Sequence, residues 1–216
     1  MRGRLVVLEG IDGCGKTTQL QALAAWLPQS GLLPAGAELL VTREPGGTPL
    51  GQSLRQLLLH PPSGADPHST AELLLYAADR AQHVQQRLEP ALAAGHWVLS
   101  DRYSGSTAAY QGHGRGLDLD LIAQLEQIAT AGLQPDLTLW LDLPLPEATR
   151  RRGERQGAAA AQPDRIEAAG EAFLARVQQG FAAQALQRGW QRIAADQSPE
   201  QVGAACRQAL QQRFGA

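Results

Sequence analysis

The sequence contains no asparagine, one lysine among nineteen basic side chains, and two cysteines in 216 residues. Its net charge of −2 is too small for a generally basic surface, so we expect no nucleic-acid partner. Apolar residues nevertheless make up 44% of the chain, which excludes a disordered protein. The length suits one domain spanning residues 1–216, with a central sheet and helices on both of its faces.

Long apolar stretches are missing from the N-terminal region as well. The run "LVVL" (5–8) ends at Glu9, which makes it too short for a signal peptide or a membrane span. We therefore expect a cytoplasmic protein with no membrane partner. Cys14 and Cys206 lie far apart and lack the close spacing of metal ligands, so we expect two reduced thiols.

Short β-like runs alternate with helical segments, which predicts a parallel α/β sheet. Several of the runs are apolar at successive positions, as strands covered on both faces are. Functional side chains should lie at the carboxyl ends of the strands, where Glu9, Arg43, Asp101 and Asp142 fall. The expected strands are 4–9, 38–42, 96–101, 137–143 and 190–196, and the expected helices are 16–27, 49–59, 70–94, 118–131 and 167–188.

Segment 153–163, "GERQGAAAAQP", differs from the rest of the chain. It is rich in glycine and alanine, has no apolar periodicity, and is flanked by arginines. We interpret it as a mobile loop or lid, in a lid region at about 150–166, rather than as a linker between domains.

The stretch "GIDGCGKT" (10–17) matches the phosphate-loop pattern G-x-x-x-x-G-K-[ST], between an expected strand and an expected helix. With this composition, a chance match is on the order of one in a thousand. Backbone N–H groups of such a loop bind phosphate oxygens, the lysine reaches the β- and γ-phosphates, and the threonine hydroxyl binds Mg²⁺. The residues expected to bind ATP are Gly10, Ile11, Asp12, Gly13, Cys14, Gly15, Lys16, Thr17 and Thr18.

Two absences narrow the class of nucleotide-binding protein. A small GTPase needs an N-K-x-D element, which a chain without asparagine cannot provide. A motor or related ATPase would usually need a longer chain with a sensor apparatus. We therefore expect a small-molecule kinase.

The arginines indicate what kind of acceptor this kinase uses. A hydroxyl acceptor would need a carboxylate base, whereas a phosphate monoester has a second pKa of about 6 and is already an oxyanion at neutral pH. Bringing two polyanions together then requires positive charge. Arginines that suit this task stand at strand ends and around the lid, at positions 43, 102, 150, 151, 152, 155 and 165.

Five further motifs follow the phosphate loop: "TREPGGTPLG" (42–51), "LLLYAADRAQHV" (73–84), "SDRYSGSTAAYQGHGRG" (100–116), "DLTLWLDLP" (136–144) and "DRIE" (164–167). In this order they resemble the thymidylate kinase family over nearly the whole chain. The resemblance implies transfer of the ATP γ-phosphate to dTMP with Mg²⁺. It also implies the P-loop nucleoside monophosphate kinase fold, with a five-stranded parallel sheet and a short lid, usually as a homodimer.

The resemblance implies roles for residues around the acceptor. Arg43 and Arg102, in the family's "REPGG" and "DRY" motifs, would hold the acceptor phosphate. Asp12 would bind the acceptor near its sugar. Asp101 would position Mg²⁺ through water, beside Thr17, and the alternative for Asp101 is capping of the next helix.

A second group of residues would recognise the nucleoside. Tyr76 and Arg80 are four residues apart on an expected helix and share a face, so the ring can stack on thymine while the guanidinium donates to a base carbonyl. Tyr110 resembles the family's aromatic residue that crowds C2′ and excludes ribonucleotides. Thr107 and Gln111 would line the same pocket.

Position 13 separates two subclasses of the family. Some members carry an arginine there, and others, bacterial in pattern, place the catalytic arginine in the lid. Because this chain has Gly13, the resemblance implies that the lid supplies the catalytic cation, with Arg152, Arg155 and Arg165 as candidates. It also suggests that residues 193–202 surround the donor adenine and that Arg150 or Arg151 stacks on it.

Two alternatives remain open at this stage. One is a deoxynucleoside kinase in which Glu44 or Asp101 acts as the base. The other roles open to Glu44 are orienting Arg43 and capping a turn. The other alternative is a binding module that takes up ATP without transferring its phosphate.

Overall fold

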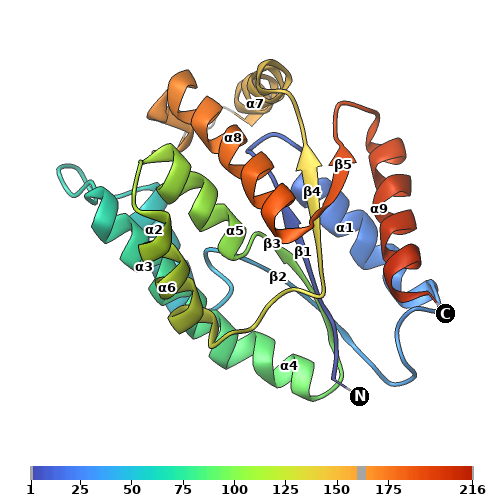
Figure 1. The fold of residues 1–216 in the computed structure, drawn as a ribbon. Coiled ribbons are helices and arrows are strands. Elements are labelled where there is room, and N and C mark those ends of the chain that lie inside the picture. Colours follow the sequence, from blue (N-terminus) through green and yellow to red (C-terminus); the bar gives the residue numbers. More distant parts are fainter. Residues whose placement is uncertain (1, 160–163, 216) are drawn as a thin grey trace.

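The structure, a computed structural model, describes residues 2–159 and 164–215, without the side chains of residues 155–159 and 167. Its described part contains one five-stranded sheet in the order β2-β3-β1-β4-β5, with every neighbouring pair parallel (Figure 1). The strands are β1 (Leu5–Glu9), β2 (Leu39–Arg43), β3 (Trp97–Asp101), β4 (Leu137–Asp142) and β5 (Gln191–Ala194). The predicted fold class and strand positions are confirmed, with ends that differ by one or two residues.

Helices cover both faces of the sheet. Val6 and Leu8 belong to a core cluster that includes side chains of α1 and α9, whereas Leu5 and Val7 contact the cluster of η2 and α4. This alternation buries every residue of β1, as expected for a central parallel strand. The helices are α1 (Lys16–Trp26), η1 (Leu27–Gln29), α2 (Pro49–Leu59), α3 (Ser69–His83), η2 (Val84–Leu88), α4 (Glu89–Ala93), α5 (Ser104–Thr107), η3 (Ala108–Gly114), α6 (Leu119–Thr130), α7 (Leu145–Ala159), η4 (Glu167–Ala169), α8 (Glu171–Arg188) and α9 (Pro199–Phe214).

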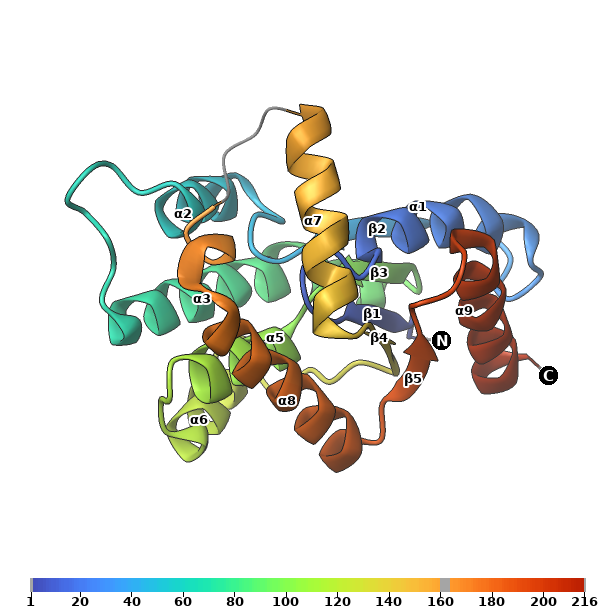
Figure 2. The same ribbon diagram turned by 90° about the horizontal axis from the view of Figure 1, so that it is seen from above.

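The register of the strands brings the expected site residues to one edge. Leu8 of β1 is paired with Asp101 of β3, and Asp101 is also paired with Arg43 of β2. Figure 2 shows α7 crossing above this carboxyl edge, between the ends of the strands and solvent. Among the described residues, no helix is long and apolar enough to cross a membrane.

The prediction of a loop at 153–163 was wrong for its first part, because α7 continues to Ala159. Alanine has the highest helix propensity, and ion pairs of Glu147 with Arg150 and Arg151 add support one turn apart. Residues 160–163 of the predicted loop lie outside the described residues. The lack of apolar periodicity therefore indicated a solvent-exposed helix rather than irregular backbone.

Besides α7, which no predicted helix covers, two further helical regions were missed. α9 begins with a capping box, in which the Ser198 hydroxyl accepts from Gln201 N and the Gln201 side chain accepts from Ser198 N. The sequence "SPEQ" carries this signature, with proline at the first helical position. The other missed region is 104–114, where the short helix α5 continues directly into the π-helix η3. Its glycines and serines favour a loop by local propensity, so packing against α8 decides its conformation.

Candidate active site

The phosphate loop joins β1 to α1, and α1 begins at Lys16. Gly15 precedes it in a left-handed conformation with φ of 95°, which allows the backbone N–H groups at the helix start to converge. These groups and the positive end of the helix dipole favour an anion. Local structure therefore agrees with the predicted phosphate site.

The surroundings of the Lys16 side chain explain why this position holds lysine and not arginine. Its Nζ donates to Gly10 O and Ile11 O at 2.9 Å each, and it lies 3.9 Å from Asp12 Oδ1. The side chain is only 6% exposed. A compact ammonium fits between these loop carbonyls, whereas a planar guanidinium needs more room and a fixed direction.

Gly13 is the point where α7 contacts the phosphate loop. A Cβ on Gly13 would lie 2.8 Å from Ala148 O and 3.2 Å from Arg152 Cγ. Both atoms belong to α7, so this helix occupies the space that a side chain at position 13 would need. The absence of a side chain at Gly13 therefore allows α7, with Arg152, to pack against the phosphate loop.

This contact gives a prediction with a matched control. Gly13 and Gly15 have φ of 90° and 95°, but a Cβ on Gly15 meets nothing within 4 Å. Alanine is strained at both positions, and only Gly13→Ala adds a clash. We expect Gly13→Ala to lower the free energy of unfolding by about 1–3 kcal/mol more than Gly15→Ala. Urea unfolding of the nucleotide-free proteins measures this, and equal losses would contradict the contact.

A cleft of about 510 Å³ lies in front of the loop. Its lining combines the loop, the ends of β2 and β3, and residues of α2 and α7, and five of its side chains are cationic. It is lined by Asp12, Gly13, Gly15, Lys16, Thr17, Thr18, Arg43, Glu44, Arg55, Asp101, Arg102, Arg151 and Asp164. Such a concentration of positive charge suits two polyphosphate groups.

Arg55 is a cation of this cleft that the sequence analysis missed. It donates to Pro45 O at 3.1 Å, and burial together with the neighbouring Arg43 lowers the pKa of its guanidinium. Its position four residues after the buried Gly51 and three before the buried Leu58 places it on the inner face of α2. The sequence did contain a signal for this role, because Arg55 interrupts the apolar face of a predicted helix.

Thr17 and Asp101 meet at the bottom of the cleft. The Thr17 hydroxyl donates to Asp101 Oδ2 at 3.3 Å, and the buried Oδ1 has no hydrogen-bond partner among the described residues. An orphaned carboxylate oxygen beside a hydroxyl fits a hydrated Mg²⁺. Asp101 does not cap the next helix, because α5 has no side-chain cap bond at its start.

A Mg²⁺ ion beside Thr17 and Asp101 would need few protein ligands. Within residues 2–159 and 164–215, no group of three or more His, Cys, Asp or Glu side chains could hold a metal ion. Mg²⁺ commonly keeps several waters and binds one or two protein groups together with substrate phosphates. The pair of Thr17 and Asp101 agrees with that pattern.

Arg102 connects the phosphate loop to the acceptor side. Its Nη2 lies 2.6 Å from Asp12 Oδ1 and 3.2 Å from the Tyr110 hydroxyl, and its Nη1 lies 2.9 Å from Ser106 Oγ. The ion pair with Asp12 raises the pKa of the Arg102 guanidinium despite its burial. Conversely, burial alone would raise the pKa of Asp12, but Arg102 and Lys16 hold it well below its usual value. Both groups therefore stay charged at neutral pH.

A second cavity adjoins the cleft on the side of α3 and η3. It brings together every residue expected to recognise the nucleoside: Tyr76, Arg80, Thr107, Tyr110 and Gln111. Arg102 and Asp12 line it as well, as do Glu44, Pro45, Arg55, Leu59, Tyr103, Ser106, Asp164 and Ile166. The sequence prediction of one shared pocket agrees with this arrangement.

Glu44 does not have the role considered for it. Its carboxylate accepts from Arg80 Nε at 2.8 Å and lies 2.9 Å from His83 Nδ1, so it orients Arg80 rather than Arg43. Arg43 is exposed and has no ion pair with any described residue. Its guanidinium is thus available to a ligand in the cleft.

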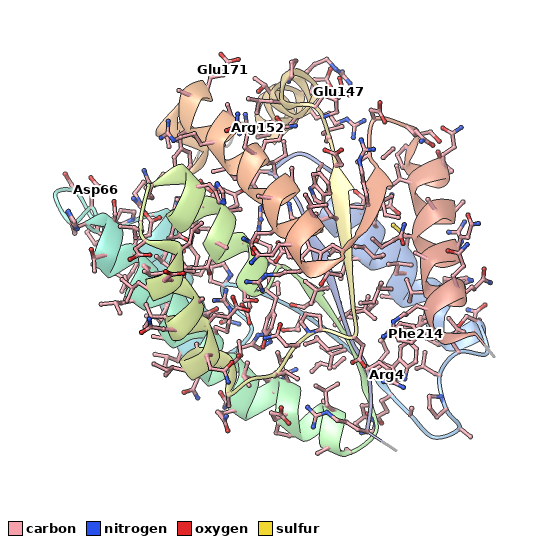
Figure 3. The ribbon with its side chains drawn as sticks, viewed as in Figure 1. Arg4, Asp66, Glu147, Arg152, Glu171 and Phe214 are labelled. Atoms are coloured by element: carbon pink, nitrogen blue, oxygen red, sulfur yellow. The ribbon has the colours of Figure 1, made fainter. Side chains whose placement is uncertain are left out.

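The lid arginines differ in what they contact. Arg152 lies on α7 beyond the end of β4 (Figure 3), is 8% exposed, and donates to Thr149 Oγ1 at 3.1 Å. Arg165 donates to Leu58 O and to the Glu72 carboxylate, away from the phosphate cleft. The side chain of Arg155 lies outside the described residues. Arg151 lines the cleft and donates to Ala195 O at 3.0 Å, whereas Arg150 is exposed and paired with Glu147.

Asp79 lies on α3 next to Glu44, and its environment predicts how the stability of the protein depends on pH. Its Oδ1 accepts from Gly46 N at 3.0 Å, and its buried Oδ2 has no partner among the described residues. Burial and the nearby Glu44 raise the pKa of Asp79 from 3.8 to about 6. Because the folded pKa is the higher one, ionisation costs stability as the pH rises from about 4 to 6, and the full cost remains above 6.

We expect Asp79→Asn to raise the free energy of unfolding at pH 7.5 by about 1–3 kcal/mol. The gain should shrink as the pH falls through 6 to 5, where Asp79 becomes neutral in the folded protein. Asp66→Asn, in the exposed loop labelled in Figure 3, is the control and should change little. Urea unfolding at the three pH values measures this, and a gain independent of pH would count against the raised pKa.

A larger cavity, of about 790 Å³, shares only Tyr103 with the cavity beside α3 and η3 and shares no lining residue with the phosphate cleft. It is bordered by α6, by the region between α8 and β5, and by the end of α9, and the ion pair of Glu126 with Arg188 stands in its wall. It contains no residue of the segment 10–18. Chemistry rather than size therefore identifies the smaller cleft as the candidate active site.

Comparison with known proteins agrees with this geometry. The family model for thymidylate kinase matches residues 8–205. Thymidylate kinase of Synechococcus sp. (strain RCC307) is 71% identical over 203 residues, covering 94% of this chain and 92% of the relative. That of Prochlorococcus marinus (strain MIT 9313) is 63% identical over 215 residues, covering 100% and 97%.

A solved structure extends the similarity to three dimensions. The crystal structure of thymidylate kinase from Ehrlichia chaffeensis is 30% identical in sequence and matches with a TM-score of 0.76. The match covers 98% of this chain and 100% of that chain. The phosphate loop, the joined cavities and these similarities lead to one conclusion: the chain belongs to the thymidylate kinase family and is a dTMP kinase.

Proposed function

We propose that the phosphoryl transfer from ATP to dTMP takes place where the two cavities join. One observation carries this proposal: Asp12, Glu44, Arg55, Arg102 and Asp164 line both the phosphate cleft and the cavity beside it. A nucleotide in each cavity would bring its phosphates to Arg102. ATP would lie along the phosphate loop, and dTMP would lie with its base between α3 and η3.

The cations at the junction supply what the reaction needs. The phosphate of dTMP is an oxyanion at neutral pH and requires no base, so the main barrier is repulsion between two polyanions. Lys16 would follow the β- and γ-phosphates of ATP, while Arg43, Arg55 and Arg102 would hold the acceptor phosphate. Arg152 would add a cation from α7.

Mg²⁺ would be held by the Thr17 hydroxyl and, through water, by Asp101. When bound, it neutralises charge on the β- and γ-phosphate oxygens. Asp101 keeps Thr17 in place through their hydrogen bond of 3.3 Å.

Recognition of the nucleoside would come from three side chains. Tyr76 would stack on the base and Arg80 would donate to a base carbonyl. The Tyr110 hydroxyl donates to Asp12 Oδ2 at 2.8 Å, and its ring packs edge-on against Phe181. This holds the ring rigidly enough to exclude a 2′-hydroxyl group.

The alternative of a deoxynucleoside kinase is disfavoured by the partners of the candidate bases. Both oxygens of Glu44 are engaged, one by Arg80 and one by His83, and the side chain is buried. Asp101 faces Thr17 at the metal side of the cleft. Glu44 is therefore not free to take a proton from a sugar hydroxyl, and Asp101 lies where Mg²⁺ would bind rather than beside the nucleoside cavity.

A substrate panel tests the proposal and separates it from the alternatives. ADP release would be measured with ATP, Mg²⁺ and, in turn, dTMP, dCMP, UMP and thymidine. We expect rapid turnover of dTMP. Turnover of thymidine without dTMP would support a nucleoside kinase, and ATP binding without any transfer would support a binding module.

The lid gives a graded prediction. Arg152→Ala should lower kcat by about 10² or more, because its side chain lies against the phosphate loop. Arg165→Ala should lower kcat much less, since its guanidinium is bound to Glu72. Arg155→Ala tests the third candidate, and Arg150→Ala, on the exposed side of α7, is the control. If Arg152, Arg155 and Arg165 all prove dispensable in steady-state assays, the lid does not supply the catalytic cation.

We also propose a homodimer. Large apolar side chains are exposed on α2, α3 and α6, which pack beside one another along one side of the molecule (Figure 1). They are Leu50, Leu57, Leu74, Leu119, Leu121 and Ile128. A self-association surface would cover them. Light scattering should give twice the mass of the chain, and Leu74→Glu should shift it toward the monomer.

The chain as a whole is proposed to be one cytoplasmic domain. Its largest core cluster contains side chains from Val6 to Leu210, so the two ends of the sequence share one core. The substrates ATP and dTMP are intracellular nucleotides, which supports a cytoplasmic location. Limited proteolysis that releases no stable fragment would agree with a single domain.

A further inference from the structure

Glu72 is a buried carboxylate for which the reaction as described has no use. It lies on α3 with an exposed fraction of 0% and accepts hydrogen bonds from three side chains. Gln111 Nε2 lies 2.6 Å from its Oε1, which Arg115 Nε also reaches at 3.4 Å. Arg115 Nη2 lies 3.2 Å from its Oε2, to which Arg165 also donates. Two guanidiniums, those of Arg115 and Arg165, form ion pairs with this buried side chain.

This carboxylate determines which way the amide of Gln111 points. An ionised carboxylate has only acceptors, so the amide must direct its NH₂ group toward Glu72 and its carbonyl oxygen away from it. A flipped amide would place its oxygen against Oε1 and leave a buried acceptor unpaired. Gln111 is 1% exposed and lines the acceptor cavity. The cavity therefore contains a fixed hydrogen-bond acceptor at this position.

Arg80 presents the complementary group in the same cavity. Its Nε donates to Glu44 and its Nη2 to Tyr103 O, and among the described residues no acceptor engages Nη1. The cavity thus combines a donor from α3 with an acceptor from η3. A 4-oxopyrimidine offers the matching pair, a carbonyl oxygen at position 4 next to an N–H at position 3. A 4-aminopyrimidine reverses both groups.

We propose that Glu72 is a positioning residue that makes the acceptor site select 4-oxopyrimidine over 4-aminopyrimidine nucleotides. It does so without touching the base, by fixing the orientation of the Gln111 amide. The proposal rests on the placement of the dTMP base beside Tyr76 and Arg80 described above. It distinguishes dTMP from dCMP, two acceptors whose phosphates and sugars are identical.

The decisive variant is Glu72→Gln, which preserves shape and changes the hydrogen-bond pattern. Arginine can only donate, and the closer arginine contacts, from Arg165 and from Arg115 Nη2, are to Oε2, so the new amide oxygen should take that position and the longer contact of Arg115 Nε with Oε1 should be lost. Its NH₂ group then faces Gln111, whose amide must invert and present a donor to the cavity. We expect the ratio of kcat/KM for dTMP to that for dCMP to fall at least tenfold.

Arg115→Gln is the matched control. It removes a partner of the same carboxylate but leaves the contact between Glu72 and Gln111 intact, so the ratio should stay within about twofold of the wild type. Glu72→Asp keeps the negative charge and draws the carboxylate back by one methylene. The long arginine side chains can follow it, whereas the contact with Gln111 should weaken, so the ratio should fall less than in Glu72→Gln. Glu72→Asp also serves if Glu72→Gln does not fold.

The outcomes separate this inference from the proposed function. If the unaltered protein does not phosphorylate dTMP, the placement of the base fails. If it does, and Glu72→Gln lowers kcat/KM equally for dTMP and dCMP, Glu72 is only structural and the inference is wrong. Dissociation constants for both monophosphates by calorimetry provide the same ratio for a variant that folds but turns over slowly.

Discussion

Lys16→Ala should lower kcat by about 10³ while the protein remains folded. The ammonium is the only cation among residues 10–18, and it lies between Gly10 O and Ile11 O in the loop that we propose holds the β- and γ-phosphates. Removing one preorganised group that stabilises transition-state charge typically costs a factor of 10² to 10³. Single-turnover kinetics at saturating ATP measure the loss, and the thermal midpoint reports on the fold.

Lys16→Arg is the control for charge alone. It keeps the positive charge but replaces a compact group with a planar one that cannot fit between two carbonyls. We expect little recovery of kcat. Wild-type kcat in either variant would show that the lysine does not contact the transferred phosphate.

Arg102 should give the second large effect, and its backbone provides an unusual control. Its φ is 74°, a left-handed conformation that is uncommon for a residue with a side chain. Arg102→Ala removes the guanidinium and keeps the strain, whereas Arg102→Gly removes both. Both variants should lose about 10³ in kcat/KM for dTMP, because each leaves the junction of the two cavities without this cation.

The two variants should differ in stability. We expect Arg102→Gly to be more stable than Arg102→Ala by about 1 kcal/mol, since glycine adopts this φ without steric cost. Both lose the ion pair with Asp12, so that loss cancels in the comparison. High activity in the alanine variant but not in the glycine variant would mean that backbone strain, rather than the guanidinium, is what the site requires, and high activity in both would mean that neither is required.

The local parts of the site were predictable because they depend on neighbours in the sequence. A phosphate loop needs glycines, a lysine and a threonine within eight residues, and the strand and helix on either side are visible in the apolar pattern. Parallel strands bring their carboxyl ends to one edge, which is why Arg43 and Asp101 could be placed together. The residues that recognise the nucleoside were predicted only from the resemblance to the family. Tyr76 and Tyr110 lie on different elements, so no local pattern links them.

The partners of the charged groups were not predictable in the same way. Glu44 was considered a partner of Arg43, its neighbour in sequence, but it binds Arg80 and His83, which are 36 and 39 residues away. Arg165 was a candidate for catalysis, and in this structure it binds Glu72. With eighteen arginines in the chain, residue type alone cannot choose among so many possible pairs.

By itself, the sequence determined the phosphate loop, the parallel sheet and the use of a phosphate as acceptor, because each follows from short-range spacing or charge. Only the tertiary structure decided that α7 packs on Gly13, that Arg55 enters the cleft, and that Glu72 orients Gln111. These contacts join segments far apart in the chain. They depend on how helices pack above the sheet, and that packing follows from the whole core rather than from any local pattern.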